Sequence, residues 1–197
     1  LGDRIRMESI ALDPGVFIRS MATRGSLGGL ATSTREVCDV LDAAGFDRIL
    51  VETVGVGQSE LAVSRMADSS LLLLVPESGD GIQTLKSGVM EVADLFVVNK
   101  ADRPGADKLR QEIEITLGIR RGNAFRHVPA HHGFKARTKA ESEALAAESD
   151  AEWKHPVLAT IAAKGEGIGE VVAALDAHRA WLAASGTMRE RRRRRLE

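Results

Sequence analysis

Five short apolar runs occur along the chain, each with the length of a strand and little alternation between apolar and polar residues. Runs of this kind are typical of strands that are covered on both faces, as in a parallel sheet. We predict strands at 16–21 (VFIRSM), 48–53 (RILVET), 70–77 (SLLLLVPE), 95–100 (LFVVNK) and 156–162 (PVLATIA).

Helical spacing of apolar residues separates these runs, and it predicts helices at 34–44, 83–93, 106–117 and 169–184, with a charged surface helix at 137–153. The first helix has clear end signals, since Ser33 is followed three residues later by Glu36 and Gly45 follows the last turn. Strands and helices in alternation imply right-handed crossovers. We therefore expect an α/β fold in which helices cover both faces of a mostly parallel sheet, followed by a C-terminal helical arm.

The composition restricts the class of protein. A chain of 197 residues with 44% hydrophobic content can bury one sizeable core. No stretch is long enough to span a membrane, and we expect no membrane partner. The single cysteine, Cys38, excludes an internal disulfide and suits a reducing compartment. With no evident targeting segment, we expect a cytoplasmic protein in which Cys38 belongs to a core rather than to a reactive site.

Charge is concentrated at the end of the sequence. The net charge is -1, and residues 189–197 hold six arginines against two glutamates, so the remainder carries -5. A basic run can bind nucleic acid, but the acidic remainder offers no second basic patch and few aromatic residues that could stack on bases. We expect no nucleic-acid partner and interpret the run as a solvated helix extension or a partner-binding arm.

Three predicted strands end in residues that can bind a ligand, and ligands of parallel sheets bind at the carboxyl ends of the strands. RILV leads to Glu52 and Gly55, LFVV leads to NKAD at 99–102, and PVLATI leads to AAKGEG at 162–167. We expect these three segments to converge on one crevice.

The NKAD segment has a specific chemical use. The carboxylate of Asp102 can accept two parallel hydrogen bonds from the ring N–H and the exocyclic amine of guanine, a donor pair that adenine lacks. Asn99 would tie neighbouring loops together, and the stem of Lys100 would lie along the base. The alternative is a polar turn after a strand, but the position behind a buried run favours guanine binding.

Glu52 and Gly55 extend this hypothesis to the phosphates. Glu52 fits an acid that holds Mg²⁺ through water, and Gly55 fits a backbone amide that faces the terminal phosphate. Alone, Glu52 could be a solvated strand end and GVG a flexible turn. Together with NKAD, about 45 residues further on, they favour a site for GTP or GDP with Mg²⁺.

Five segments, in this order, carry a family resemblance: LGDRIRM, GSLGGLATSTREV, ILVETVGVGQSE, DLFVVNKAD and GEGI. Over nearly the whole chain the sequence resembles the methylmalonyl-CoA mutase accessory GTPases, a MeaB/ArgK-like family of the SIMIBI class of P-loop GTPases. The resemblance implies a GTP-hydrolysing homodimer that dimerises through its active-site side. It also implies a chaperone that escorts adenosylcobalamin to an acyl-CoA mutase, such as methylmalonyl-CoA mutase, and protects that enzyme.

The resemblance also implies roles for residues near the phosphates. Asp3 matches a magnesium-side residue of the first switch, and Glu52 matches the second metal acid. Gly55 and Gln58 fall in the second switch, where Gln58 is a candidate for orienting the attacking water.

In the same resemblance, Asn99, Lys100 and Asp102 recognise guanine, and the backbone of Ala162 and Ala163 closes over the base edge. The segment ESGDGIQTLKSG at 77–88 resembles the additional mobile loop of the family, whose nucleotide-responsive charged positions match Asp80 and Lys86. Its three glycines fit a moving element.

The sequence departs from the family in one respect, because it contains no GxxxxGK followed by Ser or Thr, the loop that cradles phosphates. In the family this loop lies upstream of LGD. We expect 1–168 to be a GTPase domain without that segment, and 169–197 to be a C-terminal helix and the start of a dimerisation arm. A fragment or part of a longer chain is favoured over a GTPase that has lost the loop, since LGDRIRM would have no reason to persist at an amino terminus.

Two other functions stay open. A nickel-insertion GTPase is opposed by the lack of a Cys/His cluster, since no cysteine or carboxylate completes a ligand set with His127, His131 and His132. A catalytically silent module could bind the mutase through its switch loops and helical arm. Trp153 and Trp181 are expected to be packing anchors.

Overall fold

The computed structural model describes residues 7–21, 33–53, 59–76, 89–120 and 152–195. The chain divides into two compact units, Leu1–Ala67 and Asp68–Glu197. Within the described ranges, no helix has both the length and the apolar character needed to cross a membrane.

The regular elements described in the first unit are helices: the 3-10 helix η1 (Glu8–Ile10) and the α-helices α2 (Thr34–Ala43) and α3 (Ser59–Met66). The strands predicted at 16–21 and 48–53 are wrong, because the structure assigns no strand to either stretch. A strand is held by hydrogen bonds to a neighbouring strand, and neither stretch joins the ladders that the structure describes. Leu50, predicted to be buried, is accordingly 88% exposed.

Helix α2 confirms the prediction at 34–44, but only its C-terminal signal forms as expected. Gly45 has a left-handed backbone (φ 87°), and the amides of Gly45 and Phe46 donate to carbonyls of the last turn at 3.0 and 3.2 Å. This is the Schellman pattern that favours glycine after a helix. The capping box is absent, since Ser33 has ψ of 0° and makes no side-chain cap hydrogen bond. A cap side chain needs the more extended backbone that points it at the first helical amides.

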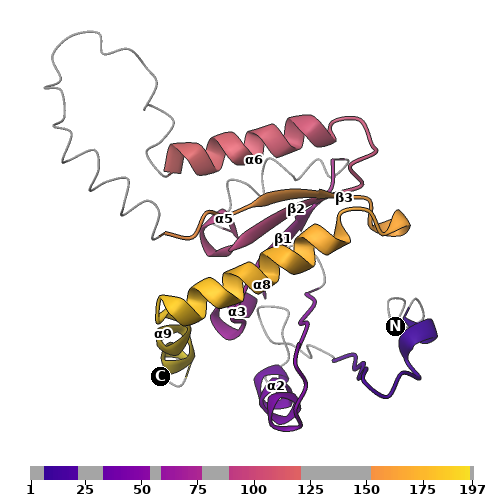
Figure 1. The fold of residues 1–197 in the computed structure, drawn as a ribbon, viewed down its shortest axis with the longest axis vertical. Helices are drawn as coiled ribbons and strands as arrows, with labels where there is room; N and C mark the ends of the chain where they lie inside the picture. The colour runs from indigo at the N-terminus through magenta and orange to yellow at the C-terminus, as the bar shows by residue number, and fades with distance from the viewer. Residues whose placement is uncertain (1–6, 22–32, 54–58, 77–88, 121–151, 196–197) are drawn as a thin grey trace, which may run out of the picture. The chain divides into compact units, whose positions relative to one another are not determined.

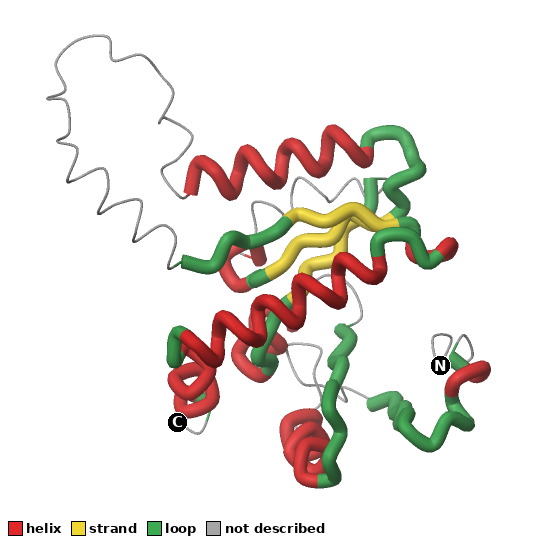
Figure 2. The backbone as a smooth tube through the Cα atoms, in the orientation of Figure 1, coloured by secondary structure: helices red, strands yellow, loops and turns green. Residues whose placement is uncertain are grey.

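The described residues of the second unit form a three-stranded parallel sheet in the order β1-β2-β3 (Figures 1 and 2). Its strands, β1 (Leu71–Leu74), β2 (Leu95–Asn99) and β3 (Val157–Thr160), confirm three of the predicted runs. Leu74 pairs with Val98, and Asn99 pairs with Thr160. The carboxyl ends of the strands therefore lie at one edge of the sheet.

Helices lie on both faces of this sheet, as predicted. Figure 1 shows α6 (Ala106–Arg120) along one face and α8 (Ile168–Ala184) along the other. The short α5 (Val89–Val92) precedes β2, and α9 (Thr187–Arg194) follows α8. Residues 83–88 of the helix predicted at 83–93, and 137–151 of the one predicted at 137–153, lie outside the described residues.

Strand β2 is the centre of the core, and its residues Leu95–Val98 are all buried. Phe96 and Val98 share one face and cluster with Ile113 and Leu117 of α6. Burial of an apolar side chain of this size contributes about 1.5–3 kcal/mol. The strand that ends in Asn99 is therefore held firmly on both sides.

Candidate functional site

The strongest candidate site lies where β2 and β3 end. Asn99 is the last residue of β2 and pairs with Thr160, the last residue of β3. The NKAD loop (99–102) and the loop at 161–167 therefore leave the sheet side by side. The structure brings together two of the three segments that the sequence predicts to converge.

The side chain of Asn99 ties the two loops together, as expected. Its Oδ1 accepts a hydrogen bond of 3.0 Å from the backbone N–H of Ala162 and one of 3.1 Å from Oγ1 of Thr160. Ala162 is exposed, so its amide would donate to water if Asn99 did not accept it. The contact therefore orders the start of the loop at 161–167.

The backbone of the NKAD loop has an unusual conformation at Lys100. Lys100 has φ of 56°, the only positive value among the described residues other than glycine. A non-glycine residue in this region costs about 1 kcal/mol or more and persists where its surroundings fix it. Here the next amide, of Ala101, donates to the carbonyl of Thr160 at 3.0 Å, and the Lys100 carbonyl accepts from Arg103 at 2.9 Å. The turn leaves Asp102 exposed.

The loop after β3 is a compact turn. A 3-10 helix, η2 (Ala162–Lys164), is followed by Gly165 with φ of 74° and Gly167 with φ of 77°. The backbone returns to the strand end through a hydrogen bond of 3.0 Å from the Ile161 amide to the Glu166 carbonyl. Helix α8 begins directly afterwards, so the turn is fixed at both ends.

Three residues contribute to this arrangement although no individual role was predicted for them from the sequence: Ala101, Thr160 and Gly167. Thr160 and Ala101 carry no sequence signal, because a threonine at the end of an apolar run and an alanine in a turn are ordinary. Gly167 could have been found, since the spaced glycines of KGEG indicate a tight turn.

The two loops offer a defined set of hydrogen-bonding groups. Asp102 supplies an exposed carboxylate that can accept two N–H donors lying side by side. Ala162 and Ala163 are exposed residues on the adjacent loop, and the Ala162 amide already donates to Asn99. Such an edge suits a planar base with adjacent donors.

The other predicted site residues are not joined to this edge by the structure. Glu52 is exposed in the first unit. The remaining predicted positions lie outside the described residues: Asp3, Gly55, Gln58, Asp80 and Lys86. In the described ranges no three His, Cys, Asp or Glu side chains gather as a metal site. Glu52 does offer the exposed carboxylate oxygens that Mg²⁺ prefers.

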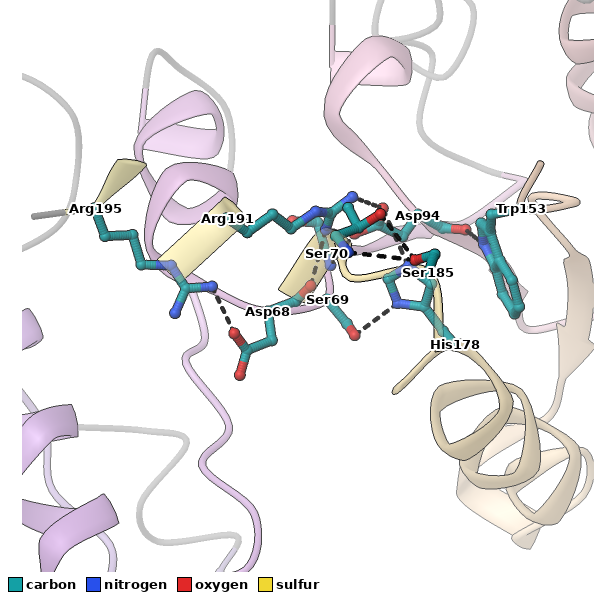
Figure 3. Close-up of polar contacts among 10 residues, drawn as sticks. Asp68, Ser69, Ser70, Asp94, Trp153, His178, Ser185, Arg191 and Arg195 are labelled. Carbon is teal, nitrogen blue, oxygen red and sulfur yellow. Dashed lines mark hydrogen bonds and ion pairs between the residues drawn. The ribbon is translucent and has the colours of Figure 1, made fainter. Parts of the chain in front are cut away.

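A second polar cluster (Figure 3) includes residues that directly precede β1 and β2. It therefore lies at the amino ends of the strands, whereas the two loops leave from the carboxyl ends. Arg191 of α9 donates to both carboxylate oxygens of Asp94 at 3.0 and 2.8 Å. Arg192 and Arg195 pair with Asp68 at 2.8 and 2.7 Å. Of the two interpretations of the arginine run, the solvated extension is therefore wrong for Arg191 and Arg195, which are partly buried against acidic residues that precede the strands. Arg192 is 52% exposed and remains solvated. For Asp68 burial raises the pKa, but Arg192 and Arg195 lower it below its ordinary value overall.

His178 of α8 is the buried centre of that cluster. It is 0% exposed and shares a hydrogen bond of 2.7 Å with Ser69 through Nδ1. Its Nε2 has no hydrogen-bond partner and lies 3.5 Å from Oδ1 of Asp94. The rings of Trp153 and Trp181 lie at 4.7 and 5.8 Å from the imidazole, which confirms both tryptophans as packing anchors. Because His178 is buried beside two tryptophan rings, we interpret it as a packing residue.

Cys38 also behaves as expected of an unreactive thiol. It is partly buried in α2, and burial, followed by the negative charge of Asp39, raises its pKa. A raised pKa keeps the sulfur protonated, and a protonated thiol is a poor nucleophile.

The chain resembles known proteins along its whole length. A family model described as "Methylmalonyl Co-A mutase-associated GTPase MeaB" matches residues 1–197. A putative GTPase of Pyrococcus abyssi is 45% identical over 197 residues, which are 100% of this chain and 53% of that protein. The GTPase ArgK of Escherichia coli is 48% identical over 102 residues, 52% of this chain and 31% of that protein.

A third relative, the mitochondrial methylmalonic aciduria type A homolog of Mus musculus, is 47% identical over 102 residues, 52% of this chain and 25% of that protein. The chain spans about half the length of the curated relatives that match it along its whole length. For the Pyrococcus abyssi protein the share is 53%.

Proposed function

The chain belongs to the methylmalonyl Co-A mutase-associated GTPase MeaB family, and we propose that it carries the guanine-binding part of a GTPase. The observation that supports this most directly is the bond from the Ala162 amide to Asn99 Oδ1, at 3.0 Å. This hydrogen bond holds the two loops side by side at the edge of the sheet, where Asp102 is exposed to solvent.

In this proposal Asp102 accepts the ring N–H and the exocyclic amine of guanine. The stem of Lys100 lies along the face of the base. Since the Ala162 amide is committed to Asn99, we assign the contact with the guanine carbonyl to the Ala163 amide. Adenine presents an acceptor where guanine presents its ring N–H, so a site built on a carboxylate rejects it.

We further propose that Glu52 and Asp3 hold Mg²⁺, which, when bound, neutralises charge on the phosphates of GTP. Glu52 contributes its exposed carboxylate to the binding of this ion. Gly55 lets the backbone approach the terminal phosphate, and Gln58 orients the attacking water. The 197 residues contain no GxxxxGK[S/T] loop, so hydrolysis also requires a phosphate-binding segment from outside them.

The family description supports a partner, an adenosylcobalamin-dependent acyl-CoA mutase such as methylmalonyl-CoA mutase. We propose that the protein, as a homodimer, supports cofactor loading and protection of that mutase. The segment with Asp80 and Lys86 carries the nucleotide state to it. Residues 1–168 would form the GTPase domain without its phosphate loop, and 169–197 a C-terminal helix and the start of the dimerisation arm.

Calorimetric titration of the full-length protein with GDP and ADP tests the proposed function. We expect GDP to bind at least about 100-fold more tightly, because the ring nitrogen of adenine is an acceptor that cannot pair with the Asp102 carboxylate and leaves both groups without a donor. Equal affinities would contradict the proposal. Glu52→Ala should remove Mg²⁺-dependent GTP hydrolysis while GDP binding in the absence of Mg²⁺ stays within about twofold, since Glu52 contacts no part of the base.

A further inference from the structure

Thr160 holds the NKAD loop through two different atoms. It is 3% exposed, and its Oγ1 donates to Oδ1 of Asn99 at 3.1 Å. Its carbonyl accepts the amide of Ala101, the residue after the strained Lys100, at 3.0 Å. The end of β3 therefore fixes the NKAD loop from two sides.

Gly167 closes the other loop against the same residue. Its φ is 77°, and a Cβ placed there would lie 2.3 Å from the Ala159 carbonyl oxygen and 3.1 Å from both Cα and Cγ2 of Thr160. Contacts this short with backbone atoms cannot be relieved by a rotamer change. The loop can therefore close on the end of β3 only when this residue has no side chain.

We propose that Thr160 and Gly167 are positioning residues for guanine recognition, in that their contact sets the spacing between the NKAD loop and the loop at 161–167. The inference rests on the proposed function. A planar base must meet Asp102 from one loop and Ala163 from the other, and such a constellation tolerates displacements of only about 0.5 Å. Neither residue touches the base, so both act through the loops.

A purely structural role for these residues predicts a different result from a positioning role. If they only stabilise the fold, their replacement lowers stability and leaves base discrimination unchanged. If they set the loop spacing, replacement weakens the contact between Asp102 and the exocyclic amine. Inosine diphosphate lacks only that amine, so the ratio of GDP to IDP affinity reports the contact directly.

The first test replaces Thr160 in the full-length protein. Thr160→Val keeps the shape but removes the hydroxyl, and we expect GDP affinity to fall about 3- to 10-fold, as for the loss of one hydrogen bond. The GDP:IDP ratio should fall with it. Thr160→Ser keeps the hydroxyl and should restore the ratio to within about twofold of the wild type. A wild-type GDP:IDP ratio in Thr160→Val would overturn the proposal.

A glycine series remains informative if Thr160→Val fails to fold. Gly169→Ala is the control, because a Cβ there meets nothing within 4 Å and no positive φ is involved. Gly165→Ala tests backbone strain alone, since φ is 74° but the space is open. Gly167→Ala adds the clash, and we expect it to weaken GDP binding at least about 10-fold and more than Gly165→Ala does.

The two proposals can fail separately. A wild-type protein that does not prefer GDP over ADP contradicts the proposed function, and this inference falls with it. A wild type that prefers GDP, combined with a Gly167→Ala variant that binds GDP and IDP like Gly169→Ala, contradicts only the positioning role.

Discussion

The guanidinium group of Arg191 spans both carboxylate oxygens of Asp94, with Nη1–Oδ2 at 3.0 Å and Nη2–Oδ1 at 2.8 Å. Two parallel charge-assisted bonds of this kind are the strongest ion-pair geometry that proteins use. Asp94 is 5% exposed and stands at the start of β2, the strand that ends in Asn99. Helix α9 is therefore joined to the amino end of the strand that leads to the candidate site.

Removing Arg191 should destabilise the second unit. Arg191→Met leaves the Asp94 carboxylate buried, while the Ser70 amide still donates to it at 2.8 Å. Breaking a buried pair from one side costs about 3–5 kcal/mol, and we expect about 2–4 kcal/mol because Arg191 itself is partly exposed. Urea unfolding followed by fluorescence of Trp153 and Trp181, which lie in this cluster, measures the change.

The matched control is Arg194→Met on the same helix. Arg194 is exposed and pairs with Glu190 one turn away, so its loss should cost less than about 0.5 kcal/mol. Equal stabilities of the two variants would show that the Arg191–Asp94 pair contributes nothing beyond a surface contact.

Stability should fall as the pH drops through the range in which His178 titrates. Burial lowers the pKa of His178; Asp94 opposes this effect, and the charges of Arg191 and His155 add to it. The unfolded chain, with a histidine pKa of about 6.5, binds the proton more readily than the folded one. Acidification below about pH 6.5 therefore favours unfolding.

Urea unfolding at pH 7.5 and 5.5 tests this for the wild type and for His178→Gln. The variant lacks the ionisable ring, so its stability should depend less on pH, even if it is lower at both values. The carboxylate of Asp68 does not interfere, because its pKa is lowered and its contribution is lost only in more acid solution. An unchanged pH dependence in the variant would show that another group is responsible.

Two glycines at the ends of α6 should respond to alanine with opposite signs. Gly105 precedes the helix with φ of 88°, so Gly105→Ala places a side chain in the left-handed region and should destabilise by about 1 kcal/mol. Gly118 lies inside the helix, and a Cβ placed there would meet nothing within 4 Å, so Gly118→Ala should stabilise by about 0.5–1 kcal/mol. Thermal unfolding of both variants measures the effect, and a shift of the same sign in both would contradict the backbone explanation.

Much of the second unit could be predicted because local and tertiary preferences agree there. The run LFVV is apolar on both faces, and its residues are buried between helices on either side of the sheet. The run RILV has the same pattern, yet Leu50 is 88% exposed. An apolar run shows that burial is favourable, but only a neighbouring strand turns it into part of a sheet.

For the candidate site, the NKAD motif could be found from the sequence, but the residues that support it could not. Asn99 joins the two loops as predicted, and Asp102 is exposed beside them, where guanine recognition by its carboxylate remains our proposal. The support from Thr160 depends on the register between β2 and β3, which no short motif encodes. The partners of Arg191 could not be predicted either, because the sequence of an arginine run does not show which acidic residues lie beside it in the fold.

The central claim, that Asp102 recognises guanine, is tested most directly by exchanging the acceptor. Asp102→Asn replaces one carboxylate oxygen with a donor opposite the exocyclic amine, and it should cost about 2–4 kcal/mol of GDP affinity. The variant should gain affinity for xanthosine diphosphate, whose carbonyl accepts the new donor. Asp107→Asn, an exposed change in the first turn of α6, should leave both affinities unchanged. Calorimetric titration of the full-length protein and both variants with GDP and XDP is the measurement. A preference of Asp102→Asn for XDP is the predicted result, and unchanged GDP affinity in that variant would contradict the account.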